Sequence, residues 1–258
     1  MTERNISFDR AAGFYDQTRK LAGSMATIGI QTILDLAGPH GSILEVGIGT
    51  GRIGVPLLQR GANLIGCDLS IEMMHQLHDK FPTARLVRSD AVRLPFPADR
   101  FDALITIHVL HLVGAWRIAL RGFKRVLKSN GVYINSWHWH DSDSIDHKVR
   151  QHWRDQIEAR GFNWRRPGIQ SREELIAELK TMGARVEEKE IARGLDQTKP
   201  REILDGLTNR VFSDTWDLPE DVLSASIRET HDWAIQELGD IDRPIDEEFR
   251  IILDVARF

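Results

Sequence analysis

Cysteine is almost absent from this chain: Cys67 is the single thiol among 258 residues. An internal disulfide and a zinc site built from several cysteines are therefore excluded. No apolar run approaches the ~18 residues that a membrane span requires, and Met1–Asp9 has no apolar signal core. The formal net charge of -4 gives no general attraction to nucleic acid or anionic lipid. These absences favour a cytoplasmic enzyme that acts on small molecules and has no membrane partner.

The chain does contain enough apolar material for a large core, with 41% hydrophobic and 28% charged residues. From Ser42 to Trp137, apolar strand-like runs alternate with segments of helical periodicity. This alternation predicts a parallel, doubly wound α/β sheet with right-handed crossovers. Two later segments, residues 184–193 and 247–258, are also predicted to be strands, which brings the sheet to seven.

We expect a single domain over residues 1–258, since no linker or repeat interrupts the chain. Its predicted parts are an N-terminal helical cap over residues 1–40, a cofactor-binding core over 41–137, two helical substrate-side inserts over 138–183 and 199–239, and the last two strands. Residues 1–36, 138–170 and 199–239 are predicted to form a lid, the last of these being set between those strands. Trp137, Trp139 and Trp216 are candidate walls of the pocket or residues of the core.

The stretch Ser42–Gly51 organises the core. The apolar run Ser42–Val46 is followed by glycines at alternate positions, Gly47, Gly49 and Gly51. A strand that ends in a Gly-rich turn before a helix is typical of α/β domains that approach a small ligand with bare backbone. The turn can be read as G-x-G-x-G, or, with Gly54 as the last glycine, as the G-x-G-x-x-G pattern of a dinucleotide site. The glycines alone leave both readings open.

Three carboxylates favour the first reading. Glu45, Asp68 and Asp90 lie at the ends of three successive predicted strands. A carboxylate aimed at the positive end of the following helix would repel a pyrophosphate there. The same three acids suit a ligand that carries ammonium, sulfonium and ribose hydroxyl groups. An NAD(P)-dependent oxidoreductase remains the alternative.

With these acids in place, the chain resembles the class I S-adenosylmethionine-dependent methyltransferases, and in particular those of type 11. The resemblance covers about residues 42–137 well and the rest only by element order. It implies a Rossmann-like seven-stranded sheet, with the final strand antiparallel and beside the fifth, and S-adenosylmethionine as cofactor. The segments that match, in the family's order, are Glu45–Gly51, Asp68–Ser70, Ser89–Ala91, Leu94–Asp102 and Phe123–Gly131.

The resemblance also implies which residues contact the cofactor. Asp68 would bind the ribose hydroxyls, although it could instead cap the following helix, a role for which Ser70 is better suited. Asp90 would recognise adenine, with turn formation as its structural alternative. Glu45 would face the ligand or pair with Arg52. The complete predicted set is Tyr15, Arg19, Glu45, Gly47, Gly49, Asp68, Leu69, Met73, Asp90, Ala91 and His108.

An N-terminal helix with Tyr15 and Arg19 resembles the one that covers the cofactor in many family members. An arginine fork suits the methionine carboxylate, but a surface helix with a half-buried tyrosine explains the same residues.

Histidines supply the candidate bases. His111 could act as a general base near neutral pH or pack under its loop, and His138 is a second weak candidate. The stretch His138–His147 has imidazoles and carboxylates but no helical i, i+4 pair, so no metal site is predicted. Methyl transfer often needs little beyond in-line placement, and the sequence identifies no required catalytic residue.

Residues 148–166 are locally basic, with Trp153, Phe162 and Trp164 interleaved. That composition is compatible with RNA binding and keeps a nucleic-acid methyltransferase as an alternative. However, Ile145, Val149, Trp153 and Ile157 form one stripe, which predicts an amphipathic helix with a solvated basic face. We therefore predict methyl transfer to a small-molecule acceptor. The acceptor atom and the oligomeric state cannot be read from the sequence.

Overall fold

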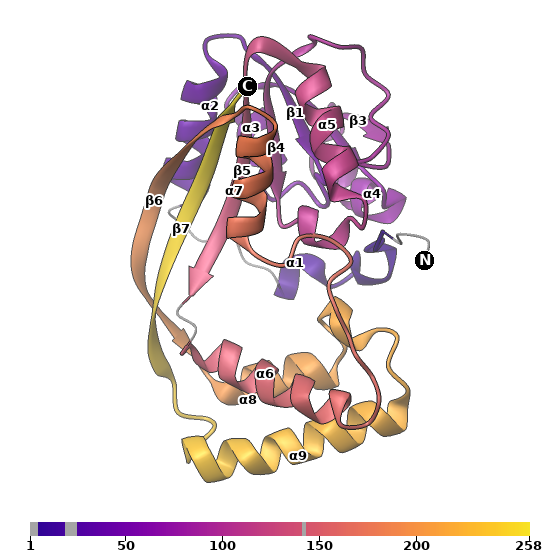
Figure 1. Ribbon diagram of the computed structural model, residues 1–258, viewed down its shortest axis with the longest axis vertical. Helices are drawn as coiled ribbons and strands as arrows, with labels where there is room; N and C mark the ends of the chain where they lie inside the picture. Colours follow the sequence, from indigo (N-terminus) through magenta and orange to yellow (C-terminus); the bar gives the residue numbers. More distant parts are fainter. Residues whose placement is uncertain (1–4, 19–24, 141–142) are drawn as a thin grey trace. The chain divides into compact units, whose positions relative to one another are not determined.

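The computed structural model describes residues 5–18, 25–140 and 143–258. Its seven strands form one sheet in the order β3-β2-β1-β4-β5-β7-β6, with β7 beside β5 (Figure 1). The predicted seven-stranded α/β fold is thus confirmed. The strands are β1 Ser42–Val46, β2 Asn63–Asp68, β3 Arg85–Arg88, β4 Phe101–Ile107, β5 Leu127–His140, β6 Arg185–Thr198 and β7 Ile245–Arg257.

The central strands β1 and β4 of the parallel half are largely apolar and buried along their length, because helices cover both faces of the sheet there. Leu44 of β1 lies opposite Ile65 of β2 and Leu104 of β4, and all pairs of neighbours from β3 to β5 are parallel. All five residues of β1 are buried. The carboxyl ends of β1, β2 and β4 consequently reach the same edge of the sheet.

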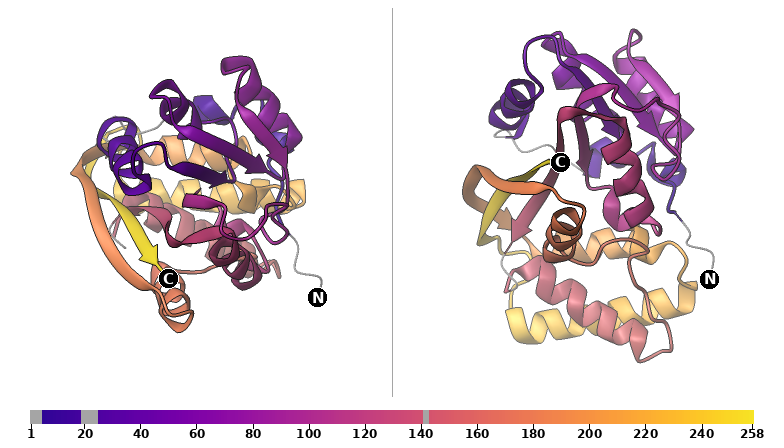
Figure 2. Two further views of the ribbon diagram at one scale, coloured as in Figure 1. Left: turned by 90° about the horizontal axis from the view of Figure 1, so that it is seen from above. Right: turned by 45° about the horizontal axis from the view of Figure 1, so that its top comes forward.

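Helices cover this half of the sheet on both faces (Figure 2). The apolar stripe of α5 is buried and shares one core cluster with α7, whereas α2 contacts α3 and β4. Ser70 is the N-cap of helix α4, and its hydroxyl accepts from the Met73 N–H. The elements of this part are η1 Asp9–Ala11, α1 Tyr15–Thr18, the π-helical turn η2 Met25–Gly29, α2 Ile30–Ala37, α3 Gly54–Gln59, α4 Ile71–Lys80, η3 Leu110–Leu112, α5 Trp116–Val126 and α7 Arg172–Thr181.

Strand β5 contains an irregularity near its start. The residues Ser129–Gly131 are typical of a turn, yet the strand begins before them, at Leu127. Phe101 of β4 pairs with Leu127, and Ala103 pairs with Val132, so the residues between them form a bulge and the ladder resumes on both sides of it.

The chain divides into two compact units. Unit 1 comprises the residues up to Trp137, residues 167–192 and residues 251–258, and it contains the parallel half of the sheet. Unit 2 comprises residues 138–166 and 193–250. The residues of β5, β6 and β7 are divided between them.

Unit 2 is mainly helical. Its helices are α6 Ile145–Glu158, α8 Pro200–Thr208, η4 Ser213–Thr215 and α9 Glu220–Leu238. Helices α8 and α9 are separated near Leu218–Pro219, and Pro200 opens α8, where its missing N–H costs nothing. The predicted stripe of α6 is buried against side chains of α8 and α9. Among the described residues, no helix has both the length and the apolar character needed to cross a membrane.

Candidate cofactor site

The candidate site lies in unit 1 at the carboxyl ends of β1 and β4. These are the strands at which the order of the sheet reverses, and open α/β sheets bind ligands there. A cavity of about 40 Å³ opens at this point, enough for a few water molecules. It is lined by Tyr15, Glu45, Gly47, Ile48, Gly49, Thr50, Arg52, Ile53, Ile107 and His108.

The glycines of this turn are explained by two different physical constraints, backbone conformation together with close packing at Gly47 and exposure of the backbone at Gly49. Gly47, Gly49 and Gly51 all have positive φ, of 74°, 55° and 82°. A Cβ on Gly47 would lie 2.3 Å from the side chain of Val109, so close packing excludes any side chain there. At Gly49 the nearest atom would be the Met73 methyl at 3.4 Å, an ordinary contact. Gly49 therefore presents bare backbone next to the cavity.

Asp68 holds this turn in place. Its Oδ2 accepts from the Gly49 N–H and its Oδ1 from the Ser70 N–H, both at 2.8 Å. Burial raises the pKa of Asp68, and the backbone donors partly offset that effect. A carboxylate has about four lone-pair sites, so Asp68 can still accept hydrogen bonds from two hydroxyls. Ser70 caps α4, so Asp68 is not needed as the helix cap and its carboxylate can bind a ligand instead.

Glu45 is buried at 3% exposure within β1. Burial raises its pKa well above the ordinary value; the Asp68 charge raises it further, and Arg52 lowers it in part. Glu45 Oε2 and Arg52 Nε are both buried and have no hydrogen-bond partner among the described residues. The expected pair is thus an electrostatic interaction that leaves one acceptor and one donor beside the cavity for a ligand.

Asp90 follows β3 and is bound by the start of the chain. The Asn5 amide Nδ2 donates to Asp90 Oδ1 at 2.9 Å and to Oδ2 at 2.8 Å. Asn5 Oδ1 in turn accepts from the Gly114 N–H at 3.0 Å. Asp90 also accepts from the Val92 N–H. A contact of this kind stabilises a turn, which is the alternative role considered for Asp90 besides adenine recognition. Ala91, beside it, is buried.

The N-terminal segment contacts the glycine turn as well. Asp16 accepts from the Thr50 hydroxyl at 2.6 Å and from Lys80, whose ammonium also donates to the Thr50 carbonyl. The Arg52 guanidinium lies 5.8 Å from the centre of the Tyr15 ring. Tyr15 is one of the residues that line the cavity. Arg19 lies outside the described residues.

The remaining predicted residues fall into three groups. Leu69 and Met73 follow Asp68, and Met73 is buried. His108, with φ of 56°, lines the cavity, whereas His111 lies in η3, where its carbonyl accepts from the Gly168 N–H. His138 belongs to β5, and its side chain is outside what the structure describes.

Sequence reasoning missed the roles of Asn5 and Thr50 and treated Arg52 only as a partner for Glu45. Thr50 and Arg52 lie within or directly after the glycine turn, so their position was a usable signal. Asn5 carries no comparable signal, because its partner Asp90 is 85 residues away in the sequence.

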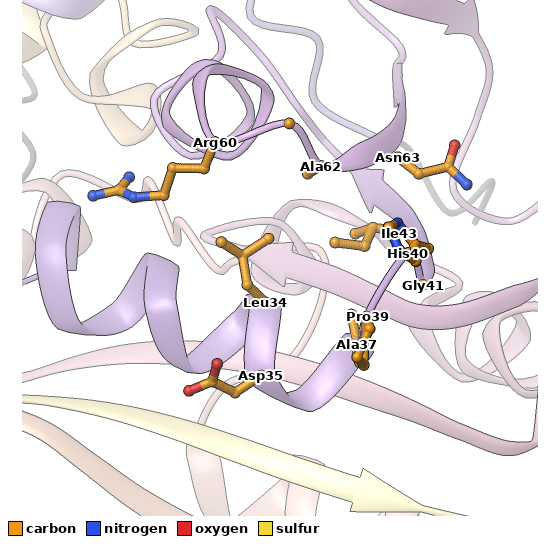
Figure 3. Close-up of a pocket in the computed structure, with 12 residues that line it drawn as sticks. Leu34, Asp35, Ala37, Pro39, His40, Gly41, Ile43, Arg60, Ala62 and Asn63 are labelled. Atoms are coloured by element: carbon orange, nitrogen blue, oxygen red, sulfur yellow. The ribbon is translucent and has the colours of Figure 1, made fainter.

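A larger cavity of about 530 Å³ lies elsewhere in unit 1. Figure 3 shows its lining side chains, which come from the end of α2, the start of β1 and the loop from α3 to β2. This is the amino end of the parallel strands, opposite to the edge where such sheets bind ligands. Its acid is the exposed Asp35, and none of the three predicted carboxylates lines it.

Known proteins agree with this picture. A family model described as a methyltransferase domain matches residues 44–135. Demethylmenaquinone methyltransferase of Streptomyces avermitilis is 34% identical over 98 residues, which are 38% of this chain and 42% of that protein. Malonyl-(acyl-carrier protein) O-methyltransferase of Salmonella typhimurium is 29% identical over 126 residues, 49% of each protein. The chain thus spans about half the length of the curated relatives it matches.

Among solved structures, the YcgJ protein from Bacillus subtilis is similar with a TM-score of 0.61 and 20% identity, over 91% of this chain and 98% of that one. At this identity the likeness shows the fold. The methyltransferase-domain match over residues 44–135 confirms the resemblance to the class I S-adenosylmethionine-dependent methyltransferases inferred from the motifs of that segment.

Proposed function

We propose that this protein transfers the sulfonium methyl group of S-adenosylmethionine to a small-molecule acceptor. The observation that carries the proposal is the unpartnered, buried Glu45 Oε2 beside the glycine turn, with Asp68 next to it. Bound there, S-adenosylmethionine supplies an already reactive methyl group. The small cavity means that Tyr15 or Arg52 must move to admit the methionine part.

Each polar residue has a defined role in this proposal. Glu45 accepts from the ammonium group, and Arg52 Nε donates to the methionine carboxylate, a role that the sequence had suggested for Arg19. Asp68 accepts from the ribose hydroxyls while its backbone bonds keep the turn in place. Asp90 accepts from the adenine amine, for which the Asn5 amide is a chemically similar donor. Catalysis then depends mainly on in-line placement of the acceptor, with His111 available as a base.

The name of one curated relative supports a small-molecule acceptor, since it specifies demethylmenaquinone. A second name specifies a malonyl group, which in that protein's substrate is carried by an acyl-carrier protein. We propose that the helical inserts of unit 2 provide acceptor contacts and a lid.

The oxidoreductase alternative is disfavoured by the surroundings of helix α3. A Cβ on Gly54, its first residue, would lie 3.0 Å from Glu45 Oε2. The Glu45 carboxyl group therefore occupies the helix start where a pyrophosphate would have to bind, and it favours a cationic ligand group over an anionic one.

Calorimetry tests the proposal. We expect S-adenosylmethionine and S-adenosylhomocysteine to bind, and NADH and NADPH to give no heat. Asp68→Ala should weaken S-adenosylhomocysteine binding by about 1–3 kcal/mol, the cost of leaving hydroxyls without their charged acceptor. Asp79→Ala, an exposed acid on α4, is the matched control and should bind normally. Tight dinucleotide binding with no response to either sulfur compound would overturn the proposed function.

A further inference from the structure

The glycine turn of the candidate site has to be held in place by its neighbours, because its own sequence gives it little rigidity. Gly47, Gly49 and Gly51 alternate along it, each with positive φ. Glycine loses more conformational freedom on ordering than any other residue. A ligand that binds a turn already ordered avoids that cost, so whatever orders the turn in the free protein raises the affinity of the site.

On the side of β2, hydrogen bonds hold the turn. The N–H groups of Gly47 and Ile48 both donate to the Cys67 carbonyl, at 2.8 Å and 3.1 Å. The Asp68 carboxylate accepts from the Gly49 N–H at 2.8 Å. This side of the turn is therefore fixed by polar contacts to the last two residues of β2.

On the side of β4, the turn packs against Val109. A Cβ on Gly47 would lie 2.3 Å from Val109 Cγ2, and 3.3 Å from both its Cβ and its Cγ1. The branched end of Val109 thus occupies the space of a side chain at position 47. The chain leaves β4 through His108, whose φ of 56° is uncommon outside glycine. Such a conformation persists where the surrounding structure requires it, and here it directly precedes the residue that packs on the turn.

Val109 belongs to a loop that is itself fixed within unit 1. The Val109 carbonyl accepts from the Leu112 N–H at 2.8 Å, and the Leu110 carbonyl accepts from the Ile169 N–H at 3.2 Å. A Cβ on Gly168 would lie 1.8 Å from the Leu110 oxygen, so the two backbone segments approach more closely than any side chain at position 168 allows. All of these residues are in unit 1. Val109 therefore contacts the glycine turn from a fixed support.

We propose that Val109 is a positioning residue for the cofactor, which holds the glycine turn in its binding conformation before the ligand arrives. That the turn binds S-adenosylmethionine rests on the proposed function. Of the described residues, Gly47 lines the cavity and Val109 does not, so Val109 acts on the ligand through Gly47. The hydrogen bonds to β2 fix one side of the turn, and the packing of Val109 fixes the other.

Hydrogen exchange of the free, full-length protein tests the ordering directly. Val109→Ala removes two methyl groups beside Gly47, so the amides of Gly47 and Ile48 should exchange about threefold faster or more, as measured by NMR. Val109→Thr keeps the branched shape and should restore rates close to those of the wild type. Val113→Ala is the matched control, because Val113 is a buried valine of the same loop. It should lower the overall stability and leave these two exchange rates unchanged.

Calorimetry with S-adenosylhomocysteine tests the consequence for binding. Val109→Ala should raise Kd by about three- to tenfold, whereas Val109→Thr and Val113→Ala should stay within about twofold of the wild type. Unchanged exchange in Val109→Ala, faster exchange with an unchanged Kd, or equal effects of Val109→Ala and Val113→Ala would each overturn the proposal. A wild-type protein that does not bind S-adenosylhomocysteine would instead reject the proposed function. The exchange rates need no ligand, so they still decide whether Val109 orders the turn.

Discussion

At the scale of single residues, Glu45 has the most unusual environment in the candidate site. It is a carboxyl group inside a strand whose other residues are also buried, next to a second acid, Asp68. Such a site favours the neutral acid in the absence of a cationic partner. An ammonium group placed beside it would restore the charge.

The raised pKa of Glu45 predicts a pH-dependent stability difference. Its folded-state pKa exceeds the ordinary value of 4.5, so its contribution is fully present below that value and is lost as pH rises through the folded-state pKa. Glu45→Gln should therefore gain in unfolding free energy relative to the wild type above pH 4.5, by at most about 1.4 kcal/mol per pH unit. Urea unfolding at several pH values measures this, with the exposed Glu72→Gln as control. A wild-type-minus-variant difference that is flat with pH would contradict it.

At the scale of elements, the sequence predicted most where burial and pattern coincide. Strand β1 has the predicted bounds because it is an apolar run closed by glycine. Strands β6 and β7 extend beyond their predicted ranges by Gly194–Thr198 and Ile245–Asp246, most of which are polar or exposed and therefore resemble a loop.

In the candidate site, too, some features could be predicted from the sequence pattern and others could not. The carboxylates at strand ends could be found because their positions repeat along the chain. The contacts of Asn5 and Asp16 could not, because they depend on how distant segments meet in three dimensions. Nor could the bulge in β5, since Ser129–Gly131 favours a turn whether or not the ladder continues beyond it.

That bulge gives a prediction with an internal control. A Cβ on Gly131 would lie 2.9 Å from the Lys128 carbonyl and 3.0 Å from that of Phe101, both rigid backbone. Gly131→Ala should therefore destabilise the fold by about 1–3 kcal/mol. In contrast, Gly122 lies within α5 with open space around it, and Gly122→Ala should stabilise by up to about 1 kcal/mol. Thermal and urea unfolding should show these opposite signs, and equal effects would refute the packing argument.

At the scale of the whole molecule, the chain combines a sheet-based unit with a helical one. Only unit 1 contains the glycine turn and the three acids.

If residues 199–239 act as the proposed lid, ligands should protect them from proteolysis. Limited digestion with proteinase K should cut this segment in the free protein, and S-adenosylhomocysteine should slow that cleavage several-fold, because closure sequesters the ligands. Mass spectrometry locates the cuts. Cleavage elsewhere that responds equally to the ligand would indicate general stabilisation instead of closure.

The hydrogen bonds between Asn5 and Asp90 have a kinetic consequence. If Asp90 binds adenine as proposed, the Asn5 amide occupies that acceptor first, and cofactor binding becomes an exchange of one NH₂ donor for another. Stopped-flow association should then reach a limiting rate at high cofactor concentration, set by release of the N-terminal segment. Asn5→Ala should raise or abolish that plateau. Ser7→Ala is the control: it removes only the exposed hydrogen bond from Ser7 to Asp9 and should retain the plateau. The first residues of the chain would thereby control how quickly the enzyme exchanges spent cofactor for fresh.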